Sequence, residues 1–282
     1  MSRIALVCDS TADLSGDDIA RLDVSVVPLN VHFGDEVFRD HVDLSPSQFL
    51  SRLEGTSLMP STSQPSPAAF RNVYDRVEPG VEAILVLCLS SQLSGTYQSA
   101  HLGREGTSTS VPVHIVDTRS CSIGLGLQVR RARELISDGQ HVEQITQTLE
   151  RETSRYQLVF FADTLEFLQR GGRIGRAGMV LGSILKVKPL LACEDGVVVP
   201  VERTRTRSRA IDGLIEIARA NQSVLRIGVL HDGRRPDDLA RVMEGVRGLA
   251  PDGEVYVNQY GPIVASHVGP GALGVCVFRH VE

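Results

Sequence analysis

Three short apolar runs in the first half of the chain, at residues 4–8, 83–89 and 113–116, each lead directly into a cluster of hydroxyl side chains. Helical patterns separate the runs, and this alternation is the signature of β-α-β units and a parallel sheet. Because the carboxyl ends of the strands border the ligand crevice of an open parallel sheet, we expect the clusters to lie around one site. Hydroxyl groups there can bind a group that accepts hydrogen bonds. The pattern predicts an α/β fold with a binding site and leaves the occupant open.

The pattern changes near residue 157. A chain of 282 residues is longer than one core usually organises, so two domains are expected. In the second half, strands are joined both by a hairpin around residues 194–196 and by helices, which indicates a mixed sheet. We predict a parallel, doubly wound α/β domain over residues 1–156. An α+β domain with a mixed sheet, over residues 157–282, is expected to complete the site.

Composition and charge exclude several classes of protein. Hydrophobic residues make up 42% and charged residues 22% of the chain, as in soluble globular proteins. A net charge of −5 gives no general reason to expect nucleic acid or an anionic membrane as a partner. The residues before the first strand are too few for a signal peptide, so we expect a cytoplasmic protein. The cysteines are odd in number and form no Cys-x-x-Cys pair, which favours reduced thiols, and we predict no metal and no cofactor.

Two further segments carry predictions about local structure. Residues 60–67 combine hydroxyl side chains with prolines and are predicted to be a loop. The hydroxyl clusters elsewhere favour a ligand-binding role for this loop, which Pro65 and Pro67 would stiffen. From Tyr256 to Phe278 the chain has no Asp, Glu, Lys or Arg, but glycine and proline interrupt the stretch repeatedly. We interpret it as two buried strands joined by a turn, rather than as a membrane span.

Ser94 follows the second apolar run and has three interpretations. A nucleophilic serine would need a Gly-x-Ser-x-Gly elbow, which the chain lacks, and an adjacent base. A distant histidine could fold in, so a serine esterase or thioesterase using Ser94 and His267 is kept as an alternative. Ser94 or Thr96 could instead cap the following helix. The remaining interpretation is a hydroxyl that donates a hydrogen bond to a bound anion.

Several arginines and one histidine are further candidates for binding residues. Arg173 stands among glycines and could pair either with a ligand carboxylate or with an acid of the other domain. Its segment has no Gly-x-x-x-x-Gly-Lys pattern and no interleaved aromatic residue, which disfavours phosphate or nucleic-acid binding. The alternating arginines of residues 203–209 predict a stripe along an extended segment, either for an acidic partner or as a solvated edge. His267 is either a core residue or a ligand-facing donor.

Six motifs, in their order along the chain, resemble those of the DegV family, whose characterised bacterial members are FakB-type subunits, the fatty-acid-binding subunits of fatty acid kinase. The resemblance spans essentially the whole chain. One departure is Asp117-Thr118, where the family usually has Asp-Ser. The motifs are Asp9-Ser10-Thr11-Ala12-Asp13-Leu14, Thr62-Ser63-Gln64-Pro65-Ser66, Leu93–Ala100, Leu168–Ile174, Lys188-Pro189 and Gly269–Gly274.

The resemblance implies a two-domain protein that buries the tail of a long-chain fatty acid. The hydroxyls of Thr62 and Ser94 would hold the carboxylate, with His267 at the polar end and Arg173 as a further candidate. Residues 179–185 are candidates for the tunnel lining, although core packing explains them equally well. The full set of ligand-binding candidates is Thr62, Ser63, Ser94, Gly95, Arg173 and His267.

The resemblance also implies that the protein has no independent catalysis. A separate ATP-dependent kinase would phosphorylate the presented carboxylate to an acyl phosphate for phospholipid synthesis. Arg203, after the strand expected at 197–202, resembles a kinase-docking residue. Loading with fatty acid would involve transient contact with a membrane, and no nucleic acid is expected as a partner.

Overall fold

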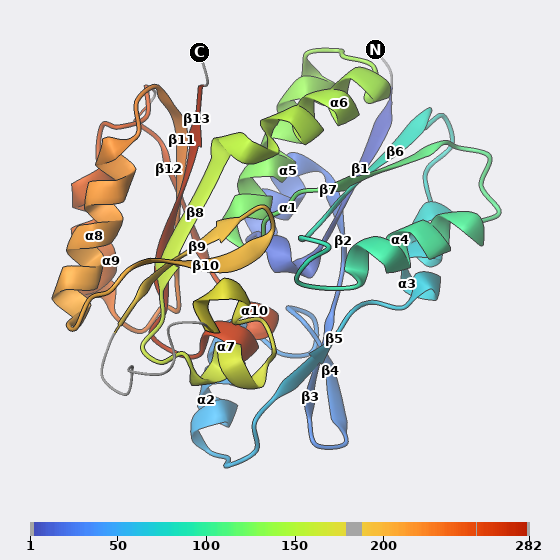
Figure 1. Cartoon of the computed structure of the whole chain (residues 1–282). Helices are drawn as coiled ribbons and strands as arrows, with labels where there is room; N and C mark the ends of the chain where they lie inside the picture. Colours follow the sequence, from blue (N-terminus) through green and yellow to red (C-terminus); the bar gives the residue numbers. More distant parts are fainter. Residues whose placement is uncertain (1–2, 179–187, 252, 281–282) are drawn as a thin grey trace.

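The computed structural model describes residues 3–178, 188–251 and 253–280. Within these ranges the chain forms two large sheets and one small sheet, and helix α5 (Ile123–Ser137) lies between the two large sheets (Figure 1). None of the helices in the described ranges is long and apolar enough to cross a membrane.

The first large sheet has four parallel strands in the order β2-β1-β6-β7. Its elements are β1 (Ile4–Asp9), β2 (Val24–Val27), β6 (Ala83–Cys88), β7 (Val113–Asp117), the 3-10 turn η1 (Ser10–Ala12) and the helices α1 (Gly16–Leu22), α3 (Pro67–Tyr74), α4 (Thr96–Glu105) and α6 (Val142–Glu152). Every residue of β6 is buried, as expected for a parallel strand covered on both faces. Helices α3 and α4 cover one face and α1, α5 and α6 the other. This arrangement confirms the predicted parallel, doubly wound α/β fold.

Local sequence signals explain where several of these helices begin. Ser15, Ser45 and Ser66 precede α1, α2 (Pro46–Glu54) and α3, and each side chain accepts a hydrogen bond from an amide of the first turn. Pro46 and Pro67 occupy first-turn positions, where a missing N–H costs nothing.

The second large sheet is mixed, with the strand order β10-β9-β8-β13-β11-β12. Only the β11–β12 pair is parallel among the described pairings of this sheet. The elements are β8 (Tyr156–Phe161), reached through the 3-10 turn η2 (Thr153–Arg155), β9 (Leu190–Glu194), β10 (Val197–Glu202), β11 (Val224–His231), β12 (Val255–Gln259), β13 (Leu273–Arg279) and the helices α8 (Arg207–Ala220) and α9 (Pro236–Val246). Helices α8 and α9 cover its outer face (Figure 1). The predicted mixed sheet is confirmed.

Helix α5 is shared by both large sheets. Leu125 and Val129 pack into the core of the parallel sheet, whereas Ile123 and Leu127 pack into a core that includes the mixed sheet. A helix that is apolar on several sides is a buried helix. Because one hydrophobic core joins residues from both halves of the chain, the division into domains at residues 156 and 157 stays a prediction.

The small sheet corrects one expectation. Its antiparallel strands β4 (Glu36–Arg39), β3 (Asn30–Phe33) and β5 (Ser61–Ser63) lie in that order, so part of the predicted loop at residues 60–67 is a strand. A three-residue strand of hydroxyl side chains between prolines has the composition of a turn. Pairing with β3, some thirty residues earlier, overrides this local preference.

The uncharged stretch from Tyr256 to Phe278 corrects a second expectation. Strands β12 and β13 are present, but helix α10 (Pro262–Val268) lies between them in place of a simple turn. Pro262 stands in the first turn, and Gly269, at φ 74°, ends the helix. Helix α10 contacts α2, α7 (Glu166–Arg170) and the small sheet, which places it beside the site described below.

Gly228 allows β11 to approach α5 closely, and this predicts the effect of Gly228→Ala. An added Cβ would lie 2.3 Å from Ile123 Cγ1, well inside van der Waals contact. Overpacking of this kind should lower the free energy of unfolding by about 1–3 kcal/mol. Denaturant unfolding measures this change. Gly16→Ala, where no atom lies within 4 Å of the added Cβ, is the control and should change stability little; equal stabilities of the two variants would contradict the prediction.

Candidate functional site

A cavity of about 240 Å³ lies where the parallel sheet, the mixed sheet and helix α10 meet. Its described lining comes from segments spread over most of the chain. The lining residues are Thr11, Leu29, Thr62, Ser63, Gln64, Leu89, Leu93, Ser94, Cys121, Ser122, Leu158, Phe160, Leu168, Arg173, Cys193, Val198, Leu230, Ile263, Val264, His267 and Val268. The predicted lining at residues 179–185 lies outside the described residues.

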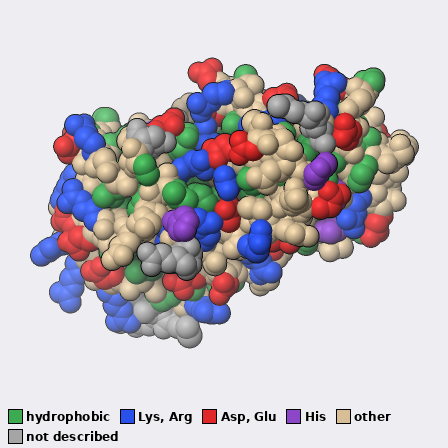
Figure 2. Space-filling model, turned by 90° about the horizontal axis from the view of Figure 1, so that it is seen from above, with side chains coloured by type: hydrophobic (Ala, Val, Ile, Leu, Met, Phe, Trp, Pro, Cys, Tyr) green, Lys and Arg blue, Asp and Glu red, His purple; other side chains and the backbone are tan. Residues whose placement is uncertain are grey.

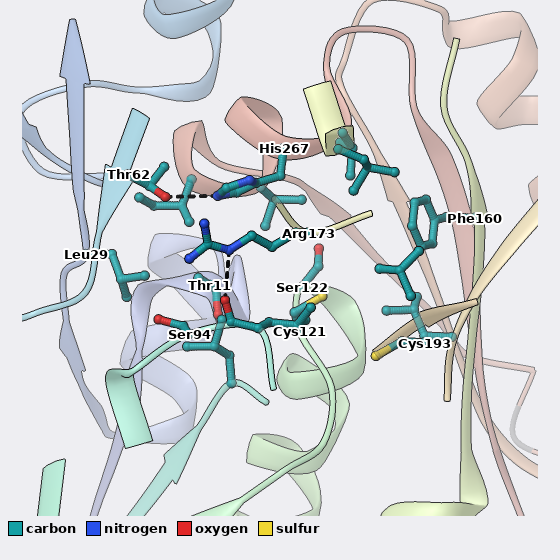
Figure 3. Close-up of a pocket in the computed structure, with 18 of the residues that line it drawn as sticks. Thr11, Leu29, Thr62, Ser94, Cys121, Ser122, Phe160, Arg173, Cys193 and His267 are labelled. Atoms are coloured by element: carbon teal, nitrogen blue, oxygen red, sulfur yellow. Dashed lines mark hydrogen bonds between the residues drawn. The ribbon is translucent and has the colours of Figure 1, made fainter. Parts of the chain in front are cut away.

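The cavity has one polar end. Figure 3 shows Thr62, His267 and Arg173 close together on one side, with Phe160 and Cys193 on the opposite side. Among the described lining residues, Arg173 is the one side chain with a permanent charge. A cavity with hydroxyls and one cation at one end and an apolar remainder suits a ligand with an anionic head and an apolar body.

Thr62 and His267 form the most direct contact at the polar end. Thr62 lies opposite Val31 in the β3–β5 ladder, so its side chain shares the inward face with buried Val31. Thr62 Oγ1 lies 2.9 Å from His267 Nε2. Burial, together with the positive charge of Arg173, lowers the pKa of His267 from 6.5 to about 4. His267 is therefore neutral near pH 7.

The surroundings of the second ring nitrogen assign the tautomer of His267. Nδ1 is buried without a hydrogen-bond partner among the described residues, and it faces Gly171, where an added Cβ would lie 2.4 Å away. A proton on Nδ1 would be a buried, unpaired donor, so we assign the proton to Nε2. Nε2–H then donates to Thr62 Oγ1. The hydroxyl proton of Thr62 is consequently available to a ligand in the cavity.

Ser94 is held by its neighbour and not by His267. Its Oγ lies 2.9 Å from Thr96 Oγ1 and accepts a hydrogen bond from Thr96 N–H at 3.3 Å. The N-cap of α4 is Gly95, so neither predicted capping residue occupies the cap position. Ser94 nevertheless lines the cavity, on the same side as Thr62 and Arg173 (Figure 3).

Arg173 donates hydrogen bonds to backbone carbonyls, which disfavours an acid of the other domain, one of the two partners considered for it. Nε donates to Leu93 C=O at 3.0 Å and Nη1 donates to Gly171 C=O at 2.7 Å. Neither bond uses Nη2. The two carbonyls fix the guanidinium at the polar end, and no carboxylate of the described residues forms an ion pair with it.

The two neighbouring candidates are placed differently. Ser63 lines the cavity, but its hydroxyl lies 2.8 Å from His32 Nε2 on the outer side of the small sheet. Gly95 is not among the described lining residues, and its missing side chain provides space for Gln64, because an added Cβ would lie 2.5 Å from the Gln64 amide. The roles predicted for all six candidate residues stay predictions.

Several lining residues were not predicted. Thr11 lines the cavity although its hydroxyl donates to Asp9 Oδ1 at 2.5 Å, and Gln64 lines both this cavity and a second groove on the surface. Gln64 stands within the motif of residues 62–66, and this position was the sequence signal that could have identified it. The apolar lining residues carry no signal, because their sequence patterns are those of ordinary core residues.

The prediction of an arginine stripe over residues 203–209 is partly wrong. Thr206 caps α8, so Arg207 begins a helix instead of continuing an extended segment. Arg207 Nε donates to Asp238 at 2.5 Å and Nη1 to Asp163 at 3.1 Å, which removes it from any free surface. Arg203 and Arg205 are exposed. Figure 2 shows basic and acidic side chains interspersed on one face of the molecule.

Comparison with known proteins assigns the chain to a protein family. A family model described as "Uncharacterised protein, DegV family" matches residues 3–280. The chain is 40% identical over 277 residues to a DegV domain-containing protein of Deinococcus radiodurans, covering 97% of this chain and 98% of that one. This chain belongs to the DegV family.

Solved structures give the same result for the fold. A DegV family protein of Thermus thermophilus, described as binding fatty acid, has 36% sequence identity and a TM-score of 0.89, covering 99% of this chain and 100% of that one. DegV of Bacillus subtilis, described as a fatty acid binding protein, has 31% identity and a TM-score of 0.88, with the same coverage. The α/β fold with a parallel and a mixed sheet is therefore that of DegV structures.

The depressed pKa of His267 predicts a pH-dependent stability. Between pH 6.5 and about 4 the unfolded chain binds a proton at His267 that the folded protein does not, so this residue lowers stability as the pH falls through that window. The loss amounts to at most about 3 kcal/mol. Denaturant unfolding of the protein and of His267→Gln, at several pH values, isolates the contribution. Identical pH dependence of the two proteins would contradict the assignment.

Proposed function

We propose that this protein binds a long-chain fatty acid, with the apolar tail in the cavity and the carboxylate at the end formed by Thr62, Ser94, His267 and Arg173. The observation that carries the proposal is the polar end of a cavity whose other lining residues are mainly apolar. Fatty acid binding by structures of the same family at 36% and 31% identity supports it.

The tail and the carboxylate of the fatty acid contribute to binding in different ways. Burying a sixteen-carbon tail, at ~0.8 kcal/mol per methylene, would favour binding from water by roughly 12 kcal/mol before ordering costs. Most of this gain is absent when the fatty acid leaves a bilayer, which is equally apolar. Selection among lipids therefore depends on the shape of the cavity and on its polar end.

The polar end suits a carboxylate that must stay reactive. A buried carboxylate needs several hydrogen bonds, which the hydroxyls of Thr62 and Ser94 can donate. His267 orients the Thr62 hydroxyl, and Arg173 adds a positive charge. Because Nε of Arg173 already donates to Leu93 C=O, the guanidinium cannot bind the carboxylate side-on through Nε and Nη2. The remaining N–H groups of the guanidinium, one on Nη1 and two on Nη2, are left for the ligand.

We further propose that the protein presents the carboxylate to a separate ATP-dependent kinase, which forms an acyl phosphate for phospholipid synthesis. Gln64 supports access from outside, because this exposed side chain lines both the cavity and the surface groove. Exposed Arg203 is the proposed docking residue for the kinase. The proposal places the protein in the cytoplasm, with transient membrane contact during loading and no cofactor of its own.

A serine esterase or thioesterase is less well supported. His267 Nε2 is engaged by Thr62, and the Ser94 hydroxyl by Thr96. A histidine with a pKa of about 4 is also a poor general base at neutral pH. Hydroxyls without an activating base favour binding over chemistry.

Native mass spectrometry tests the binding proposal. Protein purified from bacteria should carry additional mass equal to one fatty acid, and denaturation should release it. A ligand-free mass, together with no binding of added palmitate, would count decisively against a fatty acid carrier.

Thr62→Ala and Ser94→Ala test the polar end. Each removes a hydrogen bond to a charged group, worth about 1.5–3 kcal/mol, so palmitate should bind about tenfold or more weakly and form less acyl phosphate with a cognate kinase. Ser61→Ala is the matched control, since this exposed neighbour lies on the same strand with its side chain on the opposite face. Wild-type binding and phosphorylation in both test variants would remove these residues from the site.

A further inference from the structure

Two buried acids from the first half of the chain bind the first turn of α10, the helix that carries His267. Asp13 Oδ1 accepts a hydrogen bond from Gly261 N–H at 2.8 Å, and Asp40 Oδ1 accepts one from Ile263 N–H at 3.3 Å. The N-cap residue of α10 is Gly261, which has no side chain to accept such bonds. Without the two acids, buried amides at this helix end would lose their partners.

The acids are themselves fixed by residues around the cavity. Asp40 Oδ2 accepts a hydrogen bond from Ser10 Oγ at 2.7 Å, and Asp13 Oδ2 accepts one from Ser122 Oγ at 2.5 Å. Ser122 lines the cavity. Ser10 Oγ in turn accepts a hydrogen bond from the N–H of Leu29, another lining residue, at 3.1 Å. Each acid therefore joins α10 to a segment of the cavity wall.

Asp40 and Thr62 attach α10 to the small sheet at two points. Asp40 follows β4, and its N–H bonds to Leu29 C=O beside β3. Thr62, on β5, binds His267. Ile263 and His267 are four positions apart in α10 and so lie on one side of the helix. Attachment at two points along one side fixes both the position and the rotation of the helix.

The two acids are a costly way to cap a helix. Both are buried, with 3% of Asp13 and 1% of Asp40 exposed. Burial raises the pKa of Asp40 to about 7, which His41 opposes and Asp13 reinforces. Serine or asparagine would satisfy the amides without burying charge. At Asp13, His41 Nε2 lies 3.3 Å from Oδ1, and an ionised acid gives the helix a stronger, charge-assisted hydrogen bond than a neutral side chain would.

We propose that Asp13 and Asp40 are positioning residues: by binding the first turn of α10, they keep His267 within hydrogen-bonding distance of Thr62. Neither acid is among the described residues that line the cavity, so both act through the helix. The expected effect on ligand affinity rests on the proposed function. The position of His267 does not, and it can be measured without ligand.

Asp40→Ala tests the proposal through two readouts. Loss of the acceptor frees the first turn of α10 and exposes His267 to water, so the pKa of His267, measured by NMR without ligand, should rise from about 4 toward 6.5. Palmitate should bind about tenfold more weakly, or ~1.4 kcal/mol. Asp35→Ala, the same change at an exposed acid of the β3–β4 turn, is the control and should alter neither readout.

Two further variants make the result independent of a folding defect. Asp40→Asn keeps an oxygen acceptor for Ile263 N–H and should restore most of the wild-type behaviour. Ser10→Ala removes only the bond that orients Asp40, and it should shift both readouts less, in the same direction. If circular dichroism shows that Asp40→Ala is unfolded, Ser10→Ala becomes the deciding variant. Folded variants with a wild-type His267 pKa would overturn the proposal. Failure of every protein, wild type included, to bind palmitate would instead refute the proposed function.

Discussion

The simultaneous packing of α5 against both large sheets is the contact on which the rest of the structure depends. Leu125 and Val129 pack into the core of the parallel sheet, and Ile123 and Leu127 pack into the core that includes the mixed sheet. Close approach is possible because Gly228 presents no side chain to Ile123. Cys121 and Ser122, which line the cavity, immediately precede this helix. The helix therefore sets the distance between the two sheets and, with it, the position of one wall of the cavity.

For the proposed carboxylate ligand, the polar end would reconcile burial with reactivity. A carboxylate in an apolar cavity must be hydrogen-bonded, but strong ion pairing lowers its reactivity. Thr62 is oriented by a neutral histidine, and the guanidinium of Arg173 is anchored to the carbonyls of Leu93 and Gly171. Each polar group thus has a protein partner that fixes its direction before a ligand arrives, which reduces the ordering cost of binding.

Much of the fold was predictable, because strand runs such as residues 83–89 and the change of pattern near residue 157 are properties of local sequence. The small sheet and α10 were not predicted as such. Strand β5 is stable only beside β3, and α10 is fixed by acids more than 200 residues away in the chain. Such elements depend on tertiary contacts, which no local pattern reports.

The candidate site was predictable in the same uneven way. Thr62, Ser94, Arg173 and His267 were candidates from their residue types and positions, the family resemblance assigned them to a carboxylate, and the structure brings them to one cavity. The apolar lining was not identified, because Phe160 or Leu230 has the pattern of any core residue. Ser63 shows a further limit of prediction from sequence. The direction of its hydroxyl depends on which face of β5 it occupies, and pairing with β3 determines that face.

Strand β13, the last in the chain, lies between β8 and β11 in the middle of the mixed sheet, and the Thr62–His267 contact joins residues 205 positions apart. During synthesis on the ribosome, the elements of the parallel sheet emerge first, whereas the mixed sheet lacks its inner strand until residues 273–279 appear. The cavity therefore cannot be completed before helix α10 and strand β13 have emerged. A nascent chain that lacks residues 262–279 has neither the contact between Thr62 and His267 nor the inner strand of the mixed sheet, so it lacks the polar end of the candidate site.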